Sequence, residues 1–307
     1  MASANEIQLY ADSAIEAHHT IDLAVDEVRR IECQFSRYRD DSLLTHINRS
    51  AGKNAVRVDA ETAALIDYGD VCFSKSDGVF DLTSGVLRRC WDFAAGRLPD
   101  PLHLRETLEL VGWNKVIWSS PEIYLPISGM ELDFGGIGKE YAADRAAAIC
   151  LNQGIRHGLV NLAGDIRILG PQPDDSAWRI GIKHPRRPDT MIASIDLFSG
   201  ALATSGDYER FFELDGRRYC HILDATTGYP VSEFRSVSVV APLCSVAGSL
   251  STIAMIKGKK TGIKFLQSEQ AIFFAVDSDG KIETNAGSMV DKLGRSISIA
   301  ETKNVCA

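Results

Sequence analysis

Apolar and polar residues follow two different periods along the chain, one in its first half and another in its second half. Over residues 21–35, apolar positions recur at helical spacing with acidic and basic residues between them, which predicts an amphipathic helix. A short strand over 7–10 is predicted to precede it. Two more helices are predicted over 59–76 and 141–153, the latter ended by Gly154.

Strand patterns dominate from about residue 178 onward. The predicted strands cover 179–183, 194–198, 218–223, 236–242 and 271–276. A helix over 246–257 is predicted between the last two, and the short polar stretches 171–176 and 184–189 are predicted to be surface loops. No repeat or long linker interrupts the pattern, so we expect one α+β domain over residues 1–307, with mixed or antiparallel sheets and flanking helices.

Composition excludes several classes of protein. The chain has 307 residues, of which 45% are hydrophobic and 24% charged, as is ordinary for a globular protein. A net charge of −8 argues against nonspecific nucleic-acid binding. The chain has no apolar run of about 18 residues and no signal-peptide pattern at its start, which predicts no membrane span and a cytoplasmic location.

Seven cysteines are spread along the chain, and no two of them form a C-x-x-C pair. An odd count without such pairs fits neither a disulfide framework nor a structural zinc site. We therefore expect most of them to be small core residues in a reducing compartment.

Seven short motifs are too particular in their polar residues and glycines to be explained by packing alone. They are FSRYRDDSL (35–43), SDGVFDLT (76–83), LDFGGIGKEYAAD (132–144), VNLAGD (160–165), ATSGDY (203–208), HILDATTG (221–228) and AGSLST (247–252). In this order and spacing, they resemble the ApbE family of FAD:protein FMN transferases from residue 1 to about 290. That resemblance implies an α+β fold with a flavin cleft.

The third motif has a physical interpretation of its own. Gly135, Gly136 and Gly138 stand just before a predicted helix, where backbone N–H groups can approach an anion that the helix N-terminus favours. Lys139 adds a positive charge in the first turn. The spacing is not the G-x-G-x-x-G of a dinucleotide fold. Taken alone, the segment is equally compatible with a glycine-rich turn that carries a surface lysine. We expect replacement of Lys139 to leave the fold intact, because a lysine in the first turn of a helix is rarely part of the core.

The resemblance extends to the residues that contact FAD. Aromatic rings suit the faces of adenine and isoalloxazine, and aspartate suits amino and hydroxyl groups. Simple core packing remains an alternative for Tyr38 and Phe80. The flavin-binding residues that the resemblance implies are Met1, Tyr38, Val79, Phe80, Asp81, Asp133, Lys139 and His221.

Two residues are candidates for catalysis. The resemblance places His221 beside the flavin diphosphate, where an imidazole can donate to a phosphate oxygen; a structural histidine at a strand end is the alternative. Residues 204–207 are expected to form a turn that orients the phosphates or the acceptor hydroxyl. Asp207 is a candidate general base, with an Asx-turn aspartate as the alternative.

The resemblance also implies a magnesium site, and here the chain departs from the family pattern. The family has an aspartate four residues before a threonine on one helical face, whereas this chain has Gly248 before Thr252. It also has Glu140 where glycine is usual, on the helical face that Gly136 would share. The carboxylate has therefore moved from 248 to 140, or it has been lost. The expected metal ligands are the carbonyls of Gly136 and Ser251, the hydroxyl of Thr252 and, where the carboxylate has moved, Glu140.

The function that these features predict is Mg²⁺-dependent transfer of FMN from FAD to a threonine or serine hydroxyl of an acceptor flavoprotein, with AMP leaving. Two alternatives stay open: a non-catalytic FAD carrier or assembly factor, and a pyrophosphatase that splits FAD to FMN and AMP. The sequence leaves open the acceptor and the oligomeric state. Because glycine is unfavourable inside a helix, we also predict that the protein tolerates Gly248→Asp.

Overall fold

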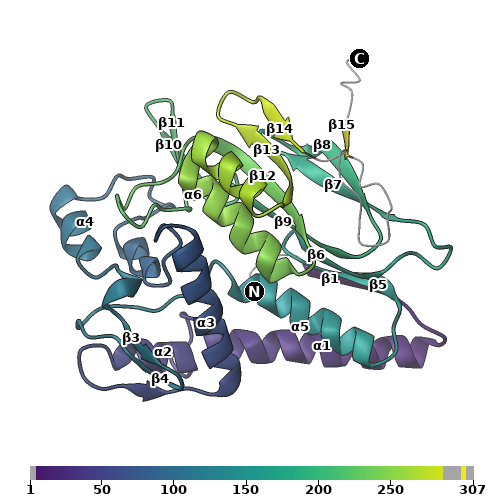
Figure 1. The fold of residues 1–307 in the computed structure, drawn as a ribbon, viewed down its shortest axis with the longest axis horizontal. Helices are drawn as coiled ribbons and strands as arrows, with labels where there is room; N and C mark the ends of the chain where they lie inside the picture. The colour runs from purple at the N-terminus through teal and green to yellow at the C-terminus, as the bar shows by residue number, and fades with distance from the viewer. Residues whose placement is uncertain (1–4, 286–298, 302–307) are drawn as a thin grey trace.

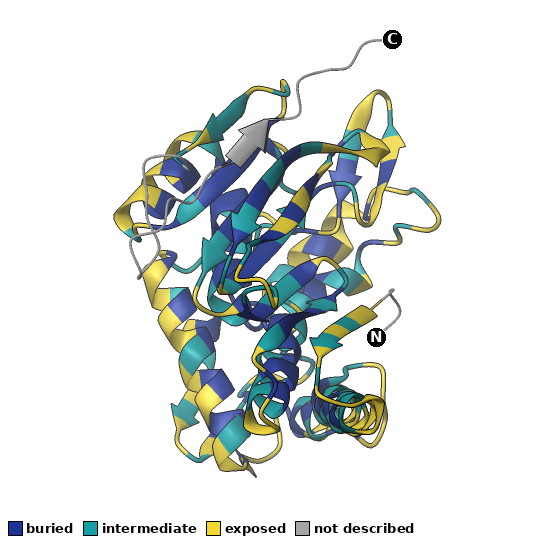
Figure 2. Cartoon of the chain, turned by 90° about the vertical axis from the view of Figure 1, so that its right-hand side faces the viewer, coloured by how far each residue is buried: buried dark blue, intermediate teal, exposed yellow. Residues whose placement is uncertain are grey.

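The computed structural model describes residues 5–285 and 299–301. Figure 1 shows a central antiparallel sheet with two long helices on one face, α5 (Gly138–Asn152) and α6 (Cys244–Ser268). Figure 2 shows that buried residues concentrate along this sheet and on the inner faces of the helices. The expectation of an α+β fold with antiparallel sheets and flanking helices is confirmed. A single domain over 1–307 stays a prediction.

The central sheet has seven strands, in the order β1-β5-β6-β9-β12-β13-β14, and each described pair is antiparallel. These strands are β1 (Asn5–Tyr10), β5 (His157–Leu162), β6 (Asp165–Gly170), β9 (Gly200–Gly206), β12 (Phe234–Ala241), β13 (Ile272–Asp277) and β14 (Ile282–Thr284). The middle strands are buried on both faces, whereas the edge strand β1 is mostly exposed or half-buried. Because both faces of the middle strands are covered, polar side chains at the ends of these strands can be shielded from bulk water.

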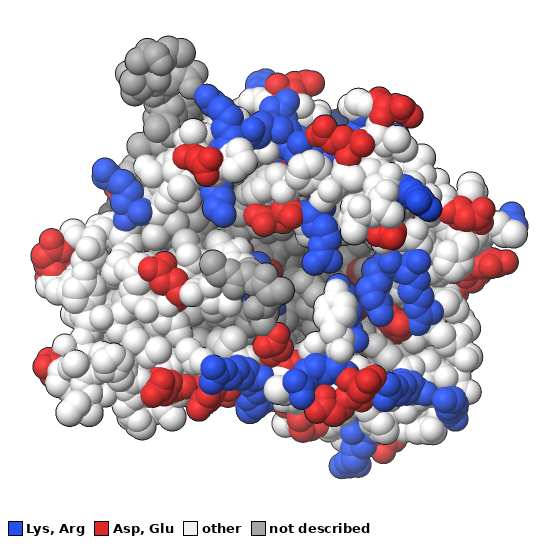
Figure 3. Space-filling model, turned by 180° about the vertical axis from the view of Figure 1, so that it is seen from behind, with Lys and Arg blue, Asp and Glu red and all other residues white. Residues whose placement is uncertain are grey.

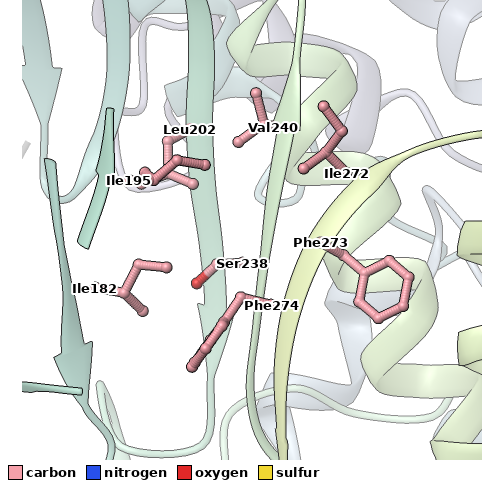
Figure 4. A pocket seen from close by; sticks show the side chains of 8 residues that line it. All are labelled: Ile182, Ile195, Leu202, Ser238, Val240, Ile272, Phe273 and Phe274. Atoms are coloured by element: carbon pink, nitrogen blue, oxygen red, sulfur yellow. The ribbon is translucent and has the colours of Figure 1, made fainter. Parts of the chain in front are cut away.

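A smaller sheet covers the other face of the central sheet. It contains β7 (Trp178–His184), β8 (Arg187–Leu197) and β15 (Ile299–Glu301). Figure 4 shows apolar side chains such as Ile182, Ile195 and Phe274 facing one another across the gap between the sheets. The space among them has no room for a water molecule, so this region is a second hydrophobic core and not a binding site.

Helices of the first half form the remaining layer. They are α1 (Ala14–Phe35), α2 (Leu43–Arg49), α3 (Ala60–Lys75) and α4 (Pro101–Leu108), with the 3₁₀ helices η1 (Ser84–Arg89) and η2 (Trp113–Lys115). The short strands are β2 (Val56–Arg57), β3 (Ile117–Ser119), β4 (Glu122–Tyr124), β10 (Phe211–Leu214) and β11 (Arg217–Cys220). Arg30 of α1 bonds Glu61 of α3, whose carboxylate also accepts from Tyr141 of α5. This network fixes the N-terminal half of α5 against α1 and α3.

The predicted helices are confirmed, with one difference in α6. Asp59 caps α3, and Gly154 has the positive φ of 93° expected just after the end of α5. The helix predicted to end at residue 257 instead continues to Ser268, with a break at Gly258, where φ is 74°. The Glu233 carboxylate accepts from the Lys259 N–H and so begins the second helical segment. Sequence periodicity found the break and missed the continuation.

Three predictions for the second half need correction. The strand expected over 218–223 ends at Cys220, because the next residues form a loop that pairs Leu223 with Pro230. The stretch 184–189 is not a loop, because only residues 185–186 form the turn of the β7–β8 hairpin and the other residues belong to the two strands. Residues 204–206 do not form a turn, because they lie in β9 and pair with β12.

The described helices include none long and apolar enough to cross a membrane.

We predict that Asp81→Ala destabilises the protein by about 3 kcal/mol, since buried groups that lose their partner cost about 1–3 kcal/mol each. One carboxylate oxygen of Asp81 accepts from the backbone N–H and the hydroxyl of Thr83, and the other accepts from the Trp113 N–H at 2.8 Å. Urea unfolding measures the loss, with exposed Asp22→Ala as the control. Equal effects of the two substitutions would contradict this role.

Candidate active site

Four elements meet at one end of the central sheet and bring together residues that lie far apart in the sequence. The first turn of α5 carries Lys139 and Glu140, and β6 begins at Asp165. Ser205 lies near the end of β9, and Thr252 lies on α6, which packs on β9. In Figure 1, the lower end of α6 lies next to α5. Six of the seven sequence motifs contribute contacts to this region or to the loop described next.

The glycine-rich loop before α5 is held between two other motifs. The Asp133 carboxylate accepts from the Gly135 N–H at 2.9 Å and forms an ion pair with Arg37. Gly85 must be small, because a Cβ there would lie 2.3 Å from an Asp133 oxygen. The ring of Phe80 takes the space beside Gly136, where a Cβ would lie 3.0 Å from the ring. These close approaches fix the loop at the start of α5.

A cluster of three charged side chains lies where α5 meets β6. Asp165 is 2% exposed and forms an ion pair with Lys139, whose amino group lies 4.0 Å from Glu140 Oε1. Glu140 is 7% exposed, and its Oε2 has no hydrogen-bond partner among the described residues. Burial, and then the nearby Asp165 carboxylate, raise the pKa of Glu140 above its ordinary value. Against the effect of burial, the two carboxylates raise the pKa of Lys139.

Hydroxyl groups line the α6 side of the same region. Ser205 Oγ lies 2.8 Å from Ser251 Oγ and 2.9 Å from Thr252 Oγ1, and Ser251 donates to the Gly248 carbonyl at 2.9 Å. Within residues 5–285 and 299–301, no group of three or more His, Cys, Asp and Glu side chains is placed to hold a metal. Two carboxylates with hydroxyl and carbonyl oxygens nevertheless suit Mg²⁺, which keeps several water ligands and needs few carboxylates.

The helical periodicity predicted that Glu140 shares a helical face with Gly136, and this prediction needs correction. The helix α5 begins at Gly138, so Gly136 belongs to the turn before it. The side chain of Glu140 instead faces α6, where it contacts Gly248. The two unusual residues of this chain are therefore neighbours in space.

His221 follows strand β11, and its backbone N–H donates to the Arg210 carbonyl at 3.0 Å. His221 is exposed, yet nearby protein atoms partly desolvate the ring and lower the pKa of His221. The positive charges of Arg210 and Lys139 act in the same direction. A neutral imidazole near Lys139 has one nitrogen that can donate and one that can accept.

Asp207 is buried and lies at the end of β9. Its two carboxylate oxygens each accept from Arg186, both at 2.6 Å, and Arg218 lies 3.8 Å away. This bidentate pair occupies both oxygens of the carboxylate. No Asx turn forms, because the described contacts of the carboxylate are with arginines.

The expected flavin residues occupy different environments. Tyr38 is 75% exposed, with its hydroxyl accepting from Arg37 and its ring beneath the Arg37 guanidinium, so core packing does not explain it. Phe80 is buried, Val79 is half-buried, and the Asp81 carboxylate is occupied by Thr83 and Trp113. Met1 lies outside the described residues. The roles of these residues in binding flavin stay predictions.

Sequence reasoning gave no role to three residues that organise this region: Arg37, Asp165 and Arg186. Arg37 and Asp165 stand inside motifs, and Asp165 follows an Ala-Gly turn at the start of a strand, which is a weak signal of a fixed carboxylate. Arg186 stands in a stretch with no motif, so only the fold shows that it reaches Asp207.

Figure 3 shows a hollow in the middle of the face opposite to the view of Figure 1, with basic and acidic side chains on its rim.

Replacing Lys139 by alanine is expected to weaken FAD binding by about tenfold or more, as for loss of a charge-assisted hydrogen bond. Contrary to the sequence expectation of an intact fold, it is also expected to lower stability, because it leaves buried Asp165 without its cation. Calorimetry and thermal unfolding check both effects, with exposed Lys264→Ala on α6 as the control. Unchanged FAD affinity would exclude Lys139 from the flavin site.

The chain is similar to known proteins of one family. The family model described as "ApbE family" matches residues 1–274. The FAD:protein FMN transferase of Treponema pallidum is 31% identical, covering 91% of this chain and 83% of the relative. One of the FAD:protein FMN transferases of Klebsiella pneumoniae is also 31% identical, covering 91% of this chain and 88% of the relative.

Solved structures show the same fold. The ApbE protein of Thermotoga maritima superposes with a TM-score of 0.84 at 34% identity, covering 91% of this chain and 93% of the other. The flavin transferase ApbE of Vibrio cholerae gives a TM-score of 0.80 at 27% identity, covering 92% and 93%. These likenesses first define a class, that of α+β proteins with the ApbE fold. With the family match over most of its length, the chain belongs to the ApbE family.

Proposed function

We propose that this protein is a transferase that uses FAD as donor and attaches FMN to a threonine or serine hydroxyl of an acceptor flavoprotein, releasing AMP. Family membership and the names of the relatives support the flavin-transfer chemistry. The observation that carries the proposal to this chain is the cluster of Lys139, Asp165 and Glu140 at the N-terminus of α5. It places positive charge and hard oxygen ligands beside a helix end that favours phosphate.

The residues in this region fit a magnesium ion. Glu140 has a buried carboxylate oxygen with no hydrogen-bond partner in the part of the chain that the structure describes, and the hydroxyls of Ser251 and Thr252 lie close to Ser205 on the neighbouring strand. Carboxylate, hydroxyl and carbonyl oxygens, including the carbonyl of Gly136, are the ligands that Mg²⁺ prefers. When bound, the ion would neutralise charge on the pyrophosphate during transfer.

The protein's own side chains bind and orient the flavin nucleotide in this proposal. Lys139 binds a phosphate oxygen as a cation, and neutral His221 donates to another. The exposed ring of Tyr38, held by Arg37, is free to stack on an aromatic face of FAD. Asp133 is fixed by Arg37 and the Gly135 N–H, which orients its carboxylate beside the glycine-rich loop.

The decisive experiment incubates the protein with FAD, Mg²⁺ and a candidate acceptor, and measures AMP release together with covalent flavin on the acceptor. The proposal expects both products in equal amounts. AMP release without covalent flavin, with or without acceptor, would identify a pyrophosphatase instead. FAD binding with neither product would identify a carrier. A cytoplasmic location for the reaction stays a prediction.

We also predict that FAD binds at about one per chain and more tightly than FMN or riboflavin. The residues proposed to bind the diphosphate, Lys139 and His221, give FAD contacts that riboflavin lacks. Calorimetry with the three flavins tests the order. Equal affinity for riboflavin would show that the diphosphate does not contribute.

A further inference from the structure

We propose that Glu140 on α5 supplies the metal-binding carboxylate that the ApbE pattern places at position 248 on α6. The inference rests on the Mg²⁺-dependent function proposed above and deepens it. It resolves the two alternatives left open by the sequence, in which the carboxylate has either moved or been lost.

The first support is that the side chains of positions 140 and 248 compete for one space. A Cβ built on Gly248 would lie 2.5 Å from Glu140 Cγ, and 3.1 Å from both Cδ and Oε1. Real Cβ atoms do not approach other carbon atoms this closely. A carboxylate can therefore project into this space from α5 or from α6, but not from both. Glycine at 248 is the residue that makes room for Glu140.

The second support is the state of the Glu140 carboxylate. It is buried, and its Oε2 has no hydrogen-bond partner among the described residues. The nearest cation, Lys139, lies 4.0 Å from Oε1 and is itself paired with Asp165. A buried carboxylate oxygen without a partner is costly, and a bound cation removes that cost. A side chain that only filled the gap beside Gly248 would not need a charge.

The third support is the set of polar groups near the Glu140 carboxylate. Gly248, which Glu140 contacts, accepts from Ser251, and Ser251 lies 2.8 Å from the hydroxyl of Ser205. Ser205 also lies 2.9 Å from the Thr252 hydroxyl. The carboxylate from α5 thus lies against the α6 turn that carries the metal-binding threonine of the family pattern. Oxygen atoms of the kinds that Mg²⁺ prefers are thus supplied to one region by both α5 and α6.

The test measures metal binding itself, by titration with Mn²⁺ followed by electron paramagnetic resonance and by Mg²⁺ competition. The variants are Glu140→Gln, Glu140→Gly, Gly248→Asp and the double variant Glu140→Gly with Gly248→Asp. Glu140→Gln keeps the shape and removes the charge, so it should bind Mn²⁺ at least about tenfold more weakly. The double variant should bind Mn²⁺ more tightly than Glu140→Gly, by about the same factor. Glu106→Gln, exposed on α4, is the control.

Two results would overturn the inference. One is wild-type Mn²⁺ affinity in Glu140→Gln, which also serves if Glu140→Gly does not fold. The other is a double variant that folds, as judged by FAD binding in the presence of a chelator, and binds Mn²⁺ no better than Glu140→Gly. A wild-type protein that binds no Mn²⁺ at millimolar concentration would overturn it as well. Mn²⁺ binding through Glu140 without FMN transfer would keep the inference and reject the proposed function.

Discussion

Gly248→Asp on its own is expected to destabilise the protein by about 1–3 kcal/mol, the cost of overpacking a filled interior. Two effects oppose each other at this position. Removing a helical glycine gains up to about 1 kcal/mol, which is why the sequence predicted tolerance. The structure reverses that expectation, because a Cβ at 248 would lie 2.5 Å from Glu140 Cγ. An added carboxylate beside Glu140 and Asp165 increases the loss by charge repulsion.

Urea unfolding of Gly248→Ala and Gly248→Asp, each in the wild-type and Glu140→Gly backgrounds, separates packing from charge. Alanine at 248 should destabilise the wild type and stabilise the Glu140→Gly protein, where the space is free. The difference between aspartate and alanine in the wild type then gives the charge effect. Stabilisation by alanine in the wild-type background would contradict the close contact between α5 and α6.

Local sequence patterns predicted some elements of this fold and missed others. The helix α3 was predicted with nearly correct ends, and α1 with its correct C-terminal end, because apolar faces and caps are local features. The predicted start of α1, at residue 21, was too late, since the helix begins at Ala14. The strands β5 and β6, which include most of the motif over 160–165, were not predicted as strands. Their pairing is long-range and leaves no local period that distinguishes them.

The candidate site was predictable as a set of motifs but not as a set of contacts. The sequence identified Lys139, Glu140 and Gly248 as unusual or chemically significant. It could not show that Glu140 faces Gly248 or that Lys139 pairs with Asp165, because α5, β6 and α6 meet only in the fold. The same is true of Arg186, which approaches Asp207 from the β7–β8 turn. Contacts of this kind determine which of two roles a residue has.

Arg186→Ala is also expected to have a large effect, a loss of stability of about 1.5–3 kcal/mol, the range for hydrogen bonds to a charged group. Asp207 is 7% exposed, and both of its oxygens accept from Arg186. Arg218, at 3.8 Å, cannot restore the bidentate geometry. Urea unfolding measures the loss, and the exposed neighbour Arg187→Ala is a matched control. Equal stability of the two variants would show that the ion pair contributes nothing.

The same pair decides what Asp207 does. A general base needs an oxygen free to accept a proton, and its removal lowers the rate by about 10²–10⁴-fold. The geometry favours a structural role, so Asp207→Asn should lower stability by about as much as Arg186→Ala. The rate per folded molecule, measured as AMP release below the unfolding temperature, should then change by less than about tenfold in both variants. A rate loss of about a hundredfold or more in Asp207→Asn alone, with Arg186→Ala still active, would instead identify Asp207 as the base.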